Sequence, residues 1–275
     1  MKVIRFARAD GVARPGALVA DGIVDFSEQG FVTVRDVIAG GQAPGTTGAR
    51  VPREQARVLA PISDPPRVFC IGLNYRDHAA EAKMKIPDAP TVFLKLSSAI
   101  TGPGAPIVLP KNSTQPDYEA ELAVVIGQGG FRIPAESWRE HVFGYTILND
   151  VSARDVQLAT TQWLLGKSFP TFCPIGPAIV TADEVPDPHD LDIRLEIDGE
   201  QMQHSNTREL IFRVPQLIEY ISSITPLETG DIISTGTPQG VGLGRKPQRW
   251  LKPGETVTIE IAGLGKLVNP TVAES

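Results

Sequence analysis

Residues 116–127 read PDYEAELAVVIG, and the rest of the chain is best interpreted outward from this stretch. From Glu119 to Ile126 it is apolar enough for a buried strand, in which residues two apart point to the same face. Glu119 and Glu121 therefore project side by side. Two like charges beside a core are costly unless a cation lies between them. The solvated face of an edge strand is the simpler alternative, but Val125 on the same face weighs against it.

Short strands dominate the remaining pattern. The 26 glycines and 24 prolines indicate many turns, and regular βαβ alternation is missing, so we predict a mostly β chain of the α+β class. Strands are expected at 2–7, 17–26, 68–71, 91–96, 119–126, 144–150, 191–197, 231–234 and 256–261. Helices are expected at 34–38, 53–59, directly after Asn74, at 152–164 and at 214–224, with a loop at 39–50.

A linker divides the chain. Residues 61–66 read PISDPP, which is typical of an extended segment because the residue before a proline avoids the helical region. We place a boundary there. The prediction is a small N-terminal domain at 1–62 and a main domain at 67–275.

Composition excludes several classes of protein. The 275 residues are 41% hydrophobic, and 26 basic against 32 acidic residues give a net charge of −6, without a dense basic run. A nucleic-acid partner is therefore not expected. No apolar stretch is long enough for a membrane span or a signal peptide, so we expect a cytoplasmic protein without a membrane partner. Cys70 and Cys173 are far apart and are expected to be reduced and buried.

A third carboxylate completes a candidate metal site. Asp150 ends the predicted strand at 144–150, and Ser152 with Asp155 has the pattern of a helix cap. Asp150 alone would be an ordinary turn residue. Together with Glu119 and Glu121, and without a Cys or His cluster, it favours Mg²⁺ or Mn²⁺.

His78 and Glu81 form a candidate base. They follow a predicted strand and lie three apart, on one face of a helix that Asn74 is expected to cap with Asp77. A carboxylate beside an imidazole fixes its tautomer and raises its basicity, which suits a general base. A surface pair is the alternative. The other histidines are expected at the surface: His141, His189 and His204.

Several cationic and polar residues are suited to an anionic substrate. Lys95 and Lys167 lie in apolar surroundings, and Arg154 and Gln157 share a predicted helix face near Asp150. The turn at 234–242 offers hydroxyl and N–H groups for a carboxylate. Neither a P-loop nor a G-x-S-x-G nucleophile elbow is present, which argues against a nucleotide hydrolase and an α/β-hydrolase.

The motifs together resemble those of the fumarylacetoacetate hydrolase (FAH) family. They occur in family order: GLNYRDHAAE (72–81), VFLK (92–95), DYEAELAVVIG (117–127), NDVSARDVQ (149–157), GKSF (166–169) and GDIISTGTPQGVG (230–242). Residues 162–191 and 245–265 look most similar to two branches, the FAH domain-containing protein 2 type and bacterial 2,4-dioxo-3-deoxy sugar acid hydrolases. The resemblance implies an FAH-type mixed β-sandwich roll, a homodimer and a Mg²⁺ or Mn²⁺ site.

The resemblance also implies a role for each matching residue. Metal ligands would be Glu119, Glu121 and Asp150. The catalytic groups would be His78, Glu81 and Lys167. His78 and Glu81 would lie on a helix that can close over the site as a lid. Substrate contacts would be Lys95, Arg154, Gln157 and Thr237.

The leading functional hypothesis is a metal-dependent hydrolase of a small 2-oxo acid. His78 would activate water, the C–C bond of a 2,4-dioxo (acylpyruvate-like) acid would break, and the metal would stabilise the pyruvate enolate. Oxaloacetate decarboxylation and oxaloacetate keto–enol tautomerisation use the same enolate, and the sequence does not separate them. A metal-binding protein without catalysis would leave His78 and Glu81 unused.

Overall fold

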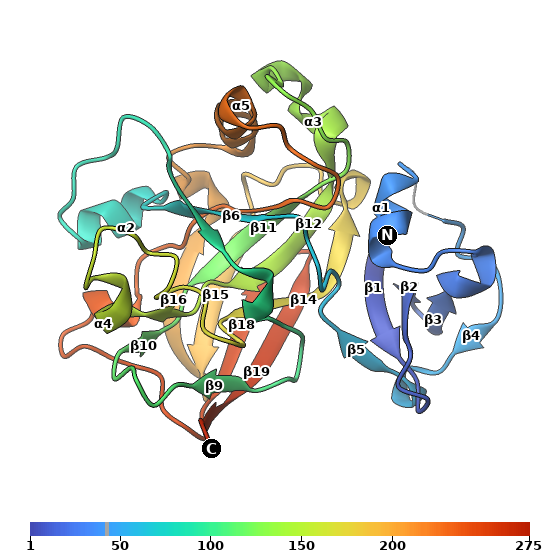
Figure 1. The fold of residues 1–275 in the computed structure, drawn as a ribbon, viewed down its shortest axis with the longest axis horizontal. Coiled ribbons are helices and arrows are strands. Elements are labelled where there is room, and N and C mark those ends of the chain that lie inside the picture. The colour runs from blue at the N-terminus through green and yellow to red at the C-terminus, as the bar shows by residue number, and fades with distance from the viewer. Residues whose placement is uncertain (42–43) are drawn as a thin grey trace.

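The computed structural model describes residues 1–41 and 44–275, and it confirms a mostly β, mixed sandwich (Figure 1). The expected loop at 39–50 includes residues 42–43, which lie outside the described residues. One large mixed sheet and one five-stranded sheet face each other, with helices at the periphery.

The large sheet passes through the whole molecule. In spatial order its strands are β4 (Arg50–Val51), β3 (Gly22–Asp25), β2 (Ala13–Val19), β1 (Lys2–Ala7), β14 (Cys173–Thr181), β12 (Val142–Asn149), β11 (Ala120–Ile126), β17 (Ile232–Ser234), β6 (Val68–Gly72) and β7 (Thr91–Lys95). Beside this path, β5 (Arg57–Leu59) pairs with β1, and β8 (Ile100–Thr101) pairs with β14. Strands β11 and β12 are buried along their whole length, which explains their nearly continuous apolar sequence.

The second sheet covers one face of the first. Its strands are β16 (Glu200–Asn206), β15 (Asp192–Ile197), β18 (Thr256–Ile261), β19 (Gly265–Ala273) and β9 (Ile107–Leu109). In β18 partly exposed and buried residues alternate, because only one face of this sheet meets the core. That core joins Leu122 and Val124 of β11 to Ile193 and Leu195 of β15. A short ladder of β10 (Pro116–Asp117) and β13 (Ser152–Ala153) lies at the end of β11 that carries the candidate site.

Helices are short. They are α1 (Val34–Ala39), α2 (Arg76–Glu81), α3 (Trp138–His141), α4 (Arg154–Gln157) and α5 (Val214–Ile224). Single 3₁₀ turns lie at Phe26–Gln29, Arg53–Gln55, Ser97–Ala99, Ala135–Ser137, Ala182–Glu184, Thr207–Glu209 and Gly242–Gly244. In α5 the buried residues Leu217, Ile218 and Ile221 recur at spacings of three and four, as the sequence predicted. Among the described residues, none of the helices has the length and apolarity to cross a membrane.

Two predicted helices are wrong. Residues 53–59 form a 3₁₀ turn and then β5, because Arg57–Leu59 pairs with β1. Residues 152–164 keep only α4 as helix, because Ser152 and Ala153 pair with β10 instead. The predicted strand at 17–26 is also divided, with a turn before Gly22 that separates β2 from β3.

Two predicted caps are also wrong. Asn74 lies one position too early to cap α2, and its amide donates to the carbonyls of Phe212 and Thr235. Ser152 donates its hydroxyl to the carbonyl of Asp150 rather than capping α4. At Asn74 two contacts distant in sequence replace the local one, whereas Ser152 bonds only two residues back along the chain.

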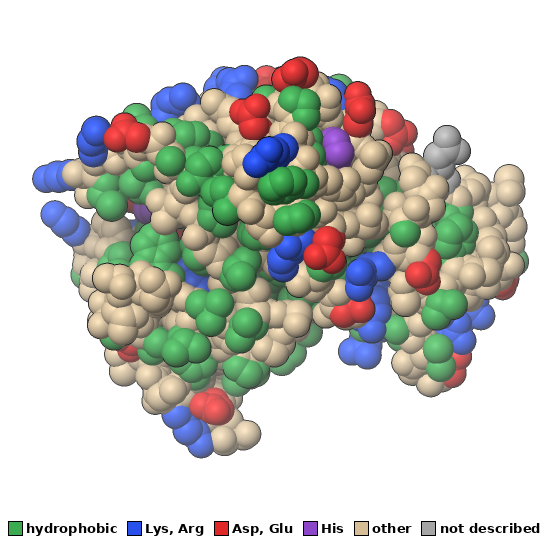
Figure 2. Space-filling view, turned by 45° about the horizontal axis from the view of Figure 1, so that its top comes forward, with side chains coloured by type: hydrophobic (Ala, Val, Ile, Leu, Met, Phe, Trp, Pro, Cys, Tyr) green, Lys and Arg blue, Asp and Glu red, His purple; other side chains and the backbone are tan. Residues whose placement is uncertain are grey.

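The N-terminal residues form a lobe that shares the large sheet. Strand β1 pairs with β14, which belongs to the main body, and Val3 and Val24 share a core with Val125 of β11. Figure 2 shows the lobe at the right, continuous with the body above and separated from it by a notch below. The division into domains 1–62 and 67–275 stays a prediction, and a continuous ladder crosses it.

The remaining sequence predictions concern isolated side chains. Cys70 and Cys173 are free thiols in the core, as expected, and burial raises the pKa of each. His141 and His204 are at or near the surface, but His189 is buried, where Nε2 accepts a hydrogen bond from the backbone N–H of Val214. The prediction of a surface position for His189 was therefore wrong.

Candidate metal centre and active site

A pocket of about 220 Å³ brings most of the predicted site residues together. Seven of the ten line it: His78, Glu119, Glu121, Arg154, Gln157, Lys167 and Thr237. The other three lie behind this wall: Glu81, Lys95 and Asp150. The apolar part of the wall includes Ile71, Phe93, Leu158, Trp163 and Leu243.

Three buried carboxylates form the centre. Glu119 directly precedes β11, Glu121 is its second residue, and Asp150 follows β12, the neighbouring antiparallel strand. One oxygen of each lies within 4.8 Å of the others. Backbone bonds hold the strand ends together, since the N–H of Asp150 donates to the carbonyl of Glu119 at 2.9 Å. This acidic triad is suited to a divalent cation.

Two lysines balance part of the negative charge. Lys167 Nζ lies 2.5 Å from Glu119 Oε2 and 2.7 Å from Asp150 Oδ2. Burial alone would lower the pKa of Lys167, but the two carboxylates outweigh it and raise the pKa. Lys95 Nζ lies 2.6 Å from Asp150 Oδ1 and donates to the carbonyl of Val151. Lys95 therefore supports Asp150 from behind and does not line the pocket.

Of the three triad carboxylates, Glu121 is the one that forms no ion pair with a cationic side chain within the described residues, 1–41 and 44–275. It accepts hydrogen bonds from the Ser234 hydroxyl at 2.5 Å and from the Gly236 N–H at 2.9 Å. Burial, followed by the charges of Asp150 and Glu119, raises the pKa of Glu121 to about 8. A divalent cation bound by the triad would relieve this repulsion, so the residues present fit a metal.

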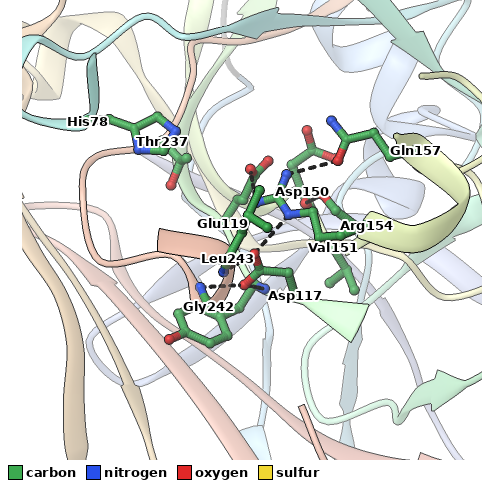
Figure 3. A network of polar contacts seen from close by, with 12 residues as sticks. His78, Asp117, Glu119, Asp150, Val151, Arg154, Gln157, Thr237, Gly242 and Leu243 are labelled. Carbon is green, nitrogen blue, oxygen red and sulfur yellow. Dashed lines mark hydrogen bonds and ion pairs between the residues drawn. The ribbon is translucent and has the colours of Figure 1, made fainter. Parts of the chain in front are cut away.

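Arg154 is anchored on three sides (Figure 3). Its guanidinium donates to Asp117 Oδ2 at 2.8 Å, to Glu119 Oε1 at 2.6 Å and to Gln157 Oε1 at 2.9 Å. Although burial raises the pKa of a carboxyl group, Arg154 and Lys167 hold the pKa of Glu119 well below its usual range. Because Gln157 uses its oxygen for Arg154, its NH₂ group is left to donate.

The sequence prediction missed Asp117, although it lies in the quoted motif. Its carboxylate is fully buried and accepts from the backbone N–H groups of Tyr118, Gly242 and Leu243, in addition to Arg154. Asp117 thereby ties α4 to the turn at 242–244. Its position two residues before Glu119, at the start of an apolar strand, was the available signal.

His78 and Glu81 face each other on α2, as predicted. His78 Nδ1 lies 3.3 Å from Glu81 Oε2, and Glu81 also accepts from the N–H of Gly240 at 3.1 Å. Burial would raise the pKa of Glu81, but these hydrogen bonds lower it, so the carboxylate is ionised beside the imidazole. In Figure 3, His78 lies on the other side of Glu119 from Arg154 and Gln157. The chemical roles of these residues remain predictions.

A tight contact between aromatic and backbone atoms closes the apolar wall. Phe93 and Trp163 meet edge to face, with ring centroids 5.4 Å apart. Trp163 also lies against Gly72, where an added Cβ would come within 2.6 Å of the indole ring. Only glycine at position 72 leaves room for this ring.

A match to a protein family covers the main body of the fold and the site just described. A model for the fumarylacetoacetate (FAA) hydrolase C-terminal region matches residues 67–272. The chain therefore belongs to the FAH family of enzymes, which confirms the resemblance seen in the sequence.

Three individual proteins place the chain within the family. It is 47% identical over 252 residues to the bovine (Bos taurus) oxaloacetate tautomerase FAHD2A, covering 91% of this chain and 79% of that protein. The structure of a fumarylacetoacetate hydrolase from Exiguobacterium antarcticum has a TM-score of 0.87 at 38% identity, with both chains fully covered. The structure of a Sphingobium maleylpyruvate hydrolase with manganese and pyruvate has a TM-score of 0.83 at 29% identity, again over both chains.

One expectation is overturned by these relatives. The bovine and human relatives are named as mitochondrial proteins. The prediction of a cytoplasmic protein was therefore wrong. It rested on composition and on the lack of an apolar leader, and neither feature identifies a compartment.

Proposed function

We propose that this chain is an oxaloacetate keto–enol tautomerase that uses Mg²⁺ or Mn²⁺. The observation that carries the proposal is the position of His78, which lines a small pocket together with Lys167 and two of the triad carboxylates. The bovine relative named as an oxaloacetate tautomerase supports the choice of substrate. The manganese ion in the related Sphingobium structure supports the choice of metal.

Tautomerisation transfers one proton between C3 of oxaloacetate and the oxygen on C2, and no C–C bond breaks. His78 is the proton carrier, because the Glu81 carboxylate beside Nδ1 fixes the tautomer of the imidazole. In the ketone-to-enol direction the imidazole removes a proton from C3 and returns it to the C2 oxygen. The reverse direction uses the same groups in the opposite order.

Other residues hold the anion. Lys167 uses two of its three N–H groups on Glu119 and Asp150, and the third, which has no hydrogen-bond acceptor among the described residues, can donate to the C2 oxygen. The NH₂ group of Gln157 and the hydroxyl of Thr237 are suited to a substrate carboxylate. A divalent cation held by the triad would supply the positive charge that stabilises a developing oxyanion.

Hydrolysis of a C–C bond in a 2,4-dioxo acid is the second candidate. The specific support is the related Sphingobium structure, that of a maleylpyruvate hydrolase with pyruvate. In that reaction His78 would remove a proton from water instead of from carbon. The same pocket residues serve both reactions, so the choice needs an assay.

The test offers purified protein the enol form of oxaloacetate, with Mg²⁺ or Mn²⁺ and, separately, with excess EDTA. We expect metal-dependent loss of the enol absorbance without release of pyruvate. Pyruvate and CO₂ from oxaloacetate would identify a decarboxylase, and pyruvate from an acylpyruvate would identify the hydrolase. No turnover of any of these would support a metal-binding protein without catalysis.

We also propose that the chain forms a homodimer through its β7 edge. Strand β7 ends the large sheet, and the apolar side chains of Val92, Leu94 and Leu96 are exposed on it or directly after it. An exposed apolar edge strand is usually covered by another chain. Light scattering at micromolar concentration should give twice the mass of one chain. A strictly monomeric mass would contradict the proposal.

A further inference from the structure

We propose that Gln203 is a positioning residue that fixes the Thr237 hydroxyl as a hydrogen-bond donor to the substrate. The inference rests on the proposed binding of a 2-oxo acid in the pocket. Gln203 lies in β16 of the five-stranded sheet and is only 1% exposed. It does not line the pocket, and no sequence motif pointed to it.

The side-chain amide of Gln203 can adopt only one orientation. Its Oε1 accepts from the backbone N–H of Ala120 at 2.9 Å, and its Nε2 donates to the carbonyl of Pro238 at 2.9 Å. A backbone N–H can only donate and a backbone carbonyl can only accept. The usual ambiguity between the amide oxygen and nitrogen is therefore removed by the partners themselves.

This orientation determines the direction of the Thr237 hydrogen bond. Nε2 of Gln203 also lies 2.9 Å from Thr237 Oγ1, and because Nε2 is a donor, the hydroxyl oxygen must accept. The hydroxyl hydrogen of Thr237 has no acceptor among the described residues. Thr237 lines the pocket beside Arg154 and Lys167, so an anionic oxygen of the substrate is the acceptor that the geometry leaves.

Gln203 also touches the metal-binding strand, and the test must separate the two contacts. Ala120 lies between Glu119 and Glu121, so loss of its partner could shift the triad. Gln203→Glu keeps an acceptor for the Ala120 N–H but cannot donate. In this variant the Thr237 hydroxyl would donate to the new carboxylate and would be withdrawn from the pocket.

The experiment measures binding of oxalate, an unreactive dicarboxylate, to the Mn²⁺-loaded protein by calorimetry. Because turnover is not required, the result is independent of whether oxaloacetate is the substrate. We expect Gln203→Glu to weaken oxalate binding about 10-fold or more, as for loss of a hydrogen bond to a charged group, with unchanged Mn²⁺ affinity. Thr237→Val should have a similar effect, and Gln201→Glu, an exposed change in the same strand, should have none.

The double variant decides the outcome. If Gln203 acts through Thr237, Gln203→Glu should cause no further loss in the Thr237→Val background. Additive losses, an unchanged oxalate affinity, or a parallel loss of Mn²⁺ affinity would each overturn the proposal. If Gln203→Glu does not fold, Gln203→Met takes its place in the same comparison of single and double variants. Absence of tautomerase activity with the predicted oxalate effects would overturn only the proposed function.

Discussion

The acidic triad and the His78–Glu81 pair meet in one pocket, but the fold holds them in different ways. The triad lies at the ends of central strands and is buried, and ion pairs with lysine and arginine surround it. The side chains of His78 and Glu81 are 17% and 22% exposed and lie on a helix of six residues. That helix is tied to its surroundings by a few polar contacts, such as those of Arg76 with Leu210 and Glu81 with Gly240.

The difference shows how the site separates two tasks. Charges at the triad interact strongly because they are shielded from water, so altering one of them changes the balance of the whole cluster. The pair on α2 has few partners to disturb. Changes at the triad should therefore affect metal binding or stability as well as rate, whereas changes on α2 should affect rate alone.

The largest effect is expected for Glu121→Gln. This change removes one charge from the cation site but leaves an oxygen for Ser234 and Gly236, so activity should fall to the background rate while the fold remains. Equilibrium dialysis with Mn²⁺ and circular dichroism would measure metal binding and folding. Glu196→Gln, on the partly exposed side of β15, is the matched control. Full activity of the unaltered, EDTA-treated protein without added metal would contradict the metal requirement.

His78→Ala should lower the rate of tautomerisation by about 10²- to 10⁴-fold, the usual contribution of a general acid–base group. Mn²⁺ affinity should not change, because in the part of the chain described His78 makes no hydrogen bond or ion pair with a triad residue. Any decarboxylase activity should also remain, since loss of CO₂ removes no proton from C3 and depends mainly on the cation. The control is His204→Ala, which removes an exposed histidine paired with Asp192. A parallel loss of metal would mean that the two regions act as one unit.

Asp117→Asn should lower the free energy of unfolding by about 3 kcal/mol, because it removes one of the two carboxylates that pair with the buried Arg154 and leaves only Glu119. The new NH₂ group would also face a backbone N–H of Gly242 or Leu243. Urea unfolding would measure the loss. Asp190→Asn breaks an exposed ion pair with Arg208 and should leave the free energy of unfolding nearly unchanged. Equal effects of the two changes would argue against a special role for the buried network.

The stability of the metal-free protein should also depend on pH. The pKa of Glu121 in the folded state, about 8, is above its ordinary value of 4.5, so the folded state binds a proton that the unfolded chain releases. The resulting stability is complete below about pH 4.5 and is lost as the pH rises through 8. Urea unfolding in EDTA at several pH values would show this loss. Glu121→Gln should remove the contribution, and a pH-independent difference between the two proteins would contradict it.

Local patterns predicted the elements in which one face or the whole segment is buried. The boundaries of β18 and α5 agree with the prediction, because their apolar spacing follows the strand and helix periods. The helix predicted at 152–164 failed for a different reason. Ser152 pairs with Asp117, and the N–H of Ala153 donates to Gly166, so partners elsewhere in the chain override the local preference.

The sequence by itself determined the family, the mostly β class and the placement of Glu119 and Glu121 on one face, because strand alternation and motif order are local properties. Only the tertiary structure decided that Lys167 lines the pocket while Lys95 lies behind Asp150. It also decided that Gln203, 83 residues from Ala120 and 34 from Thr237, connects the metal-binding strand to the substrate turn. The direction of the hydrogen bond between Gln203 and Thr237 depends on partners that are distant along the chain, and local residue spacing does not predict such partners.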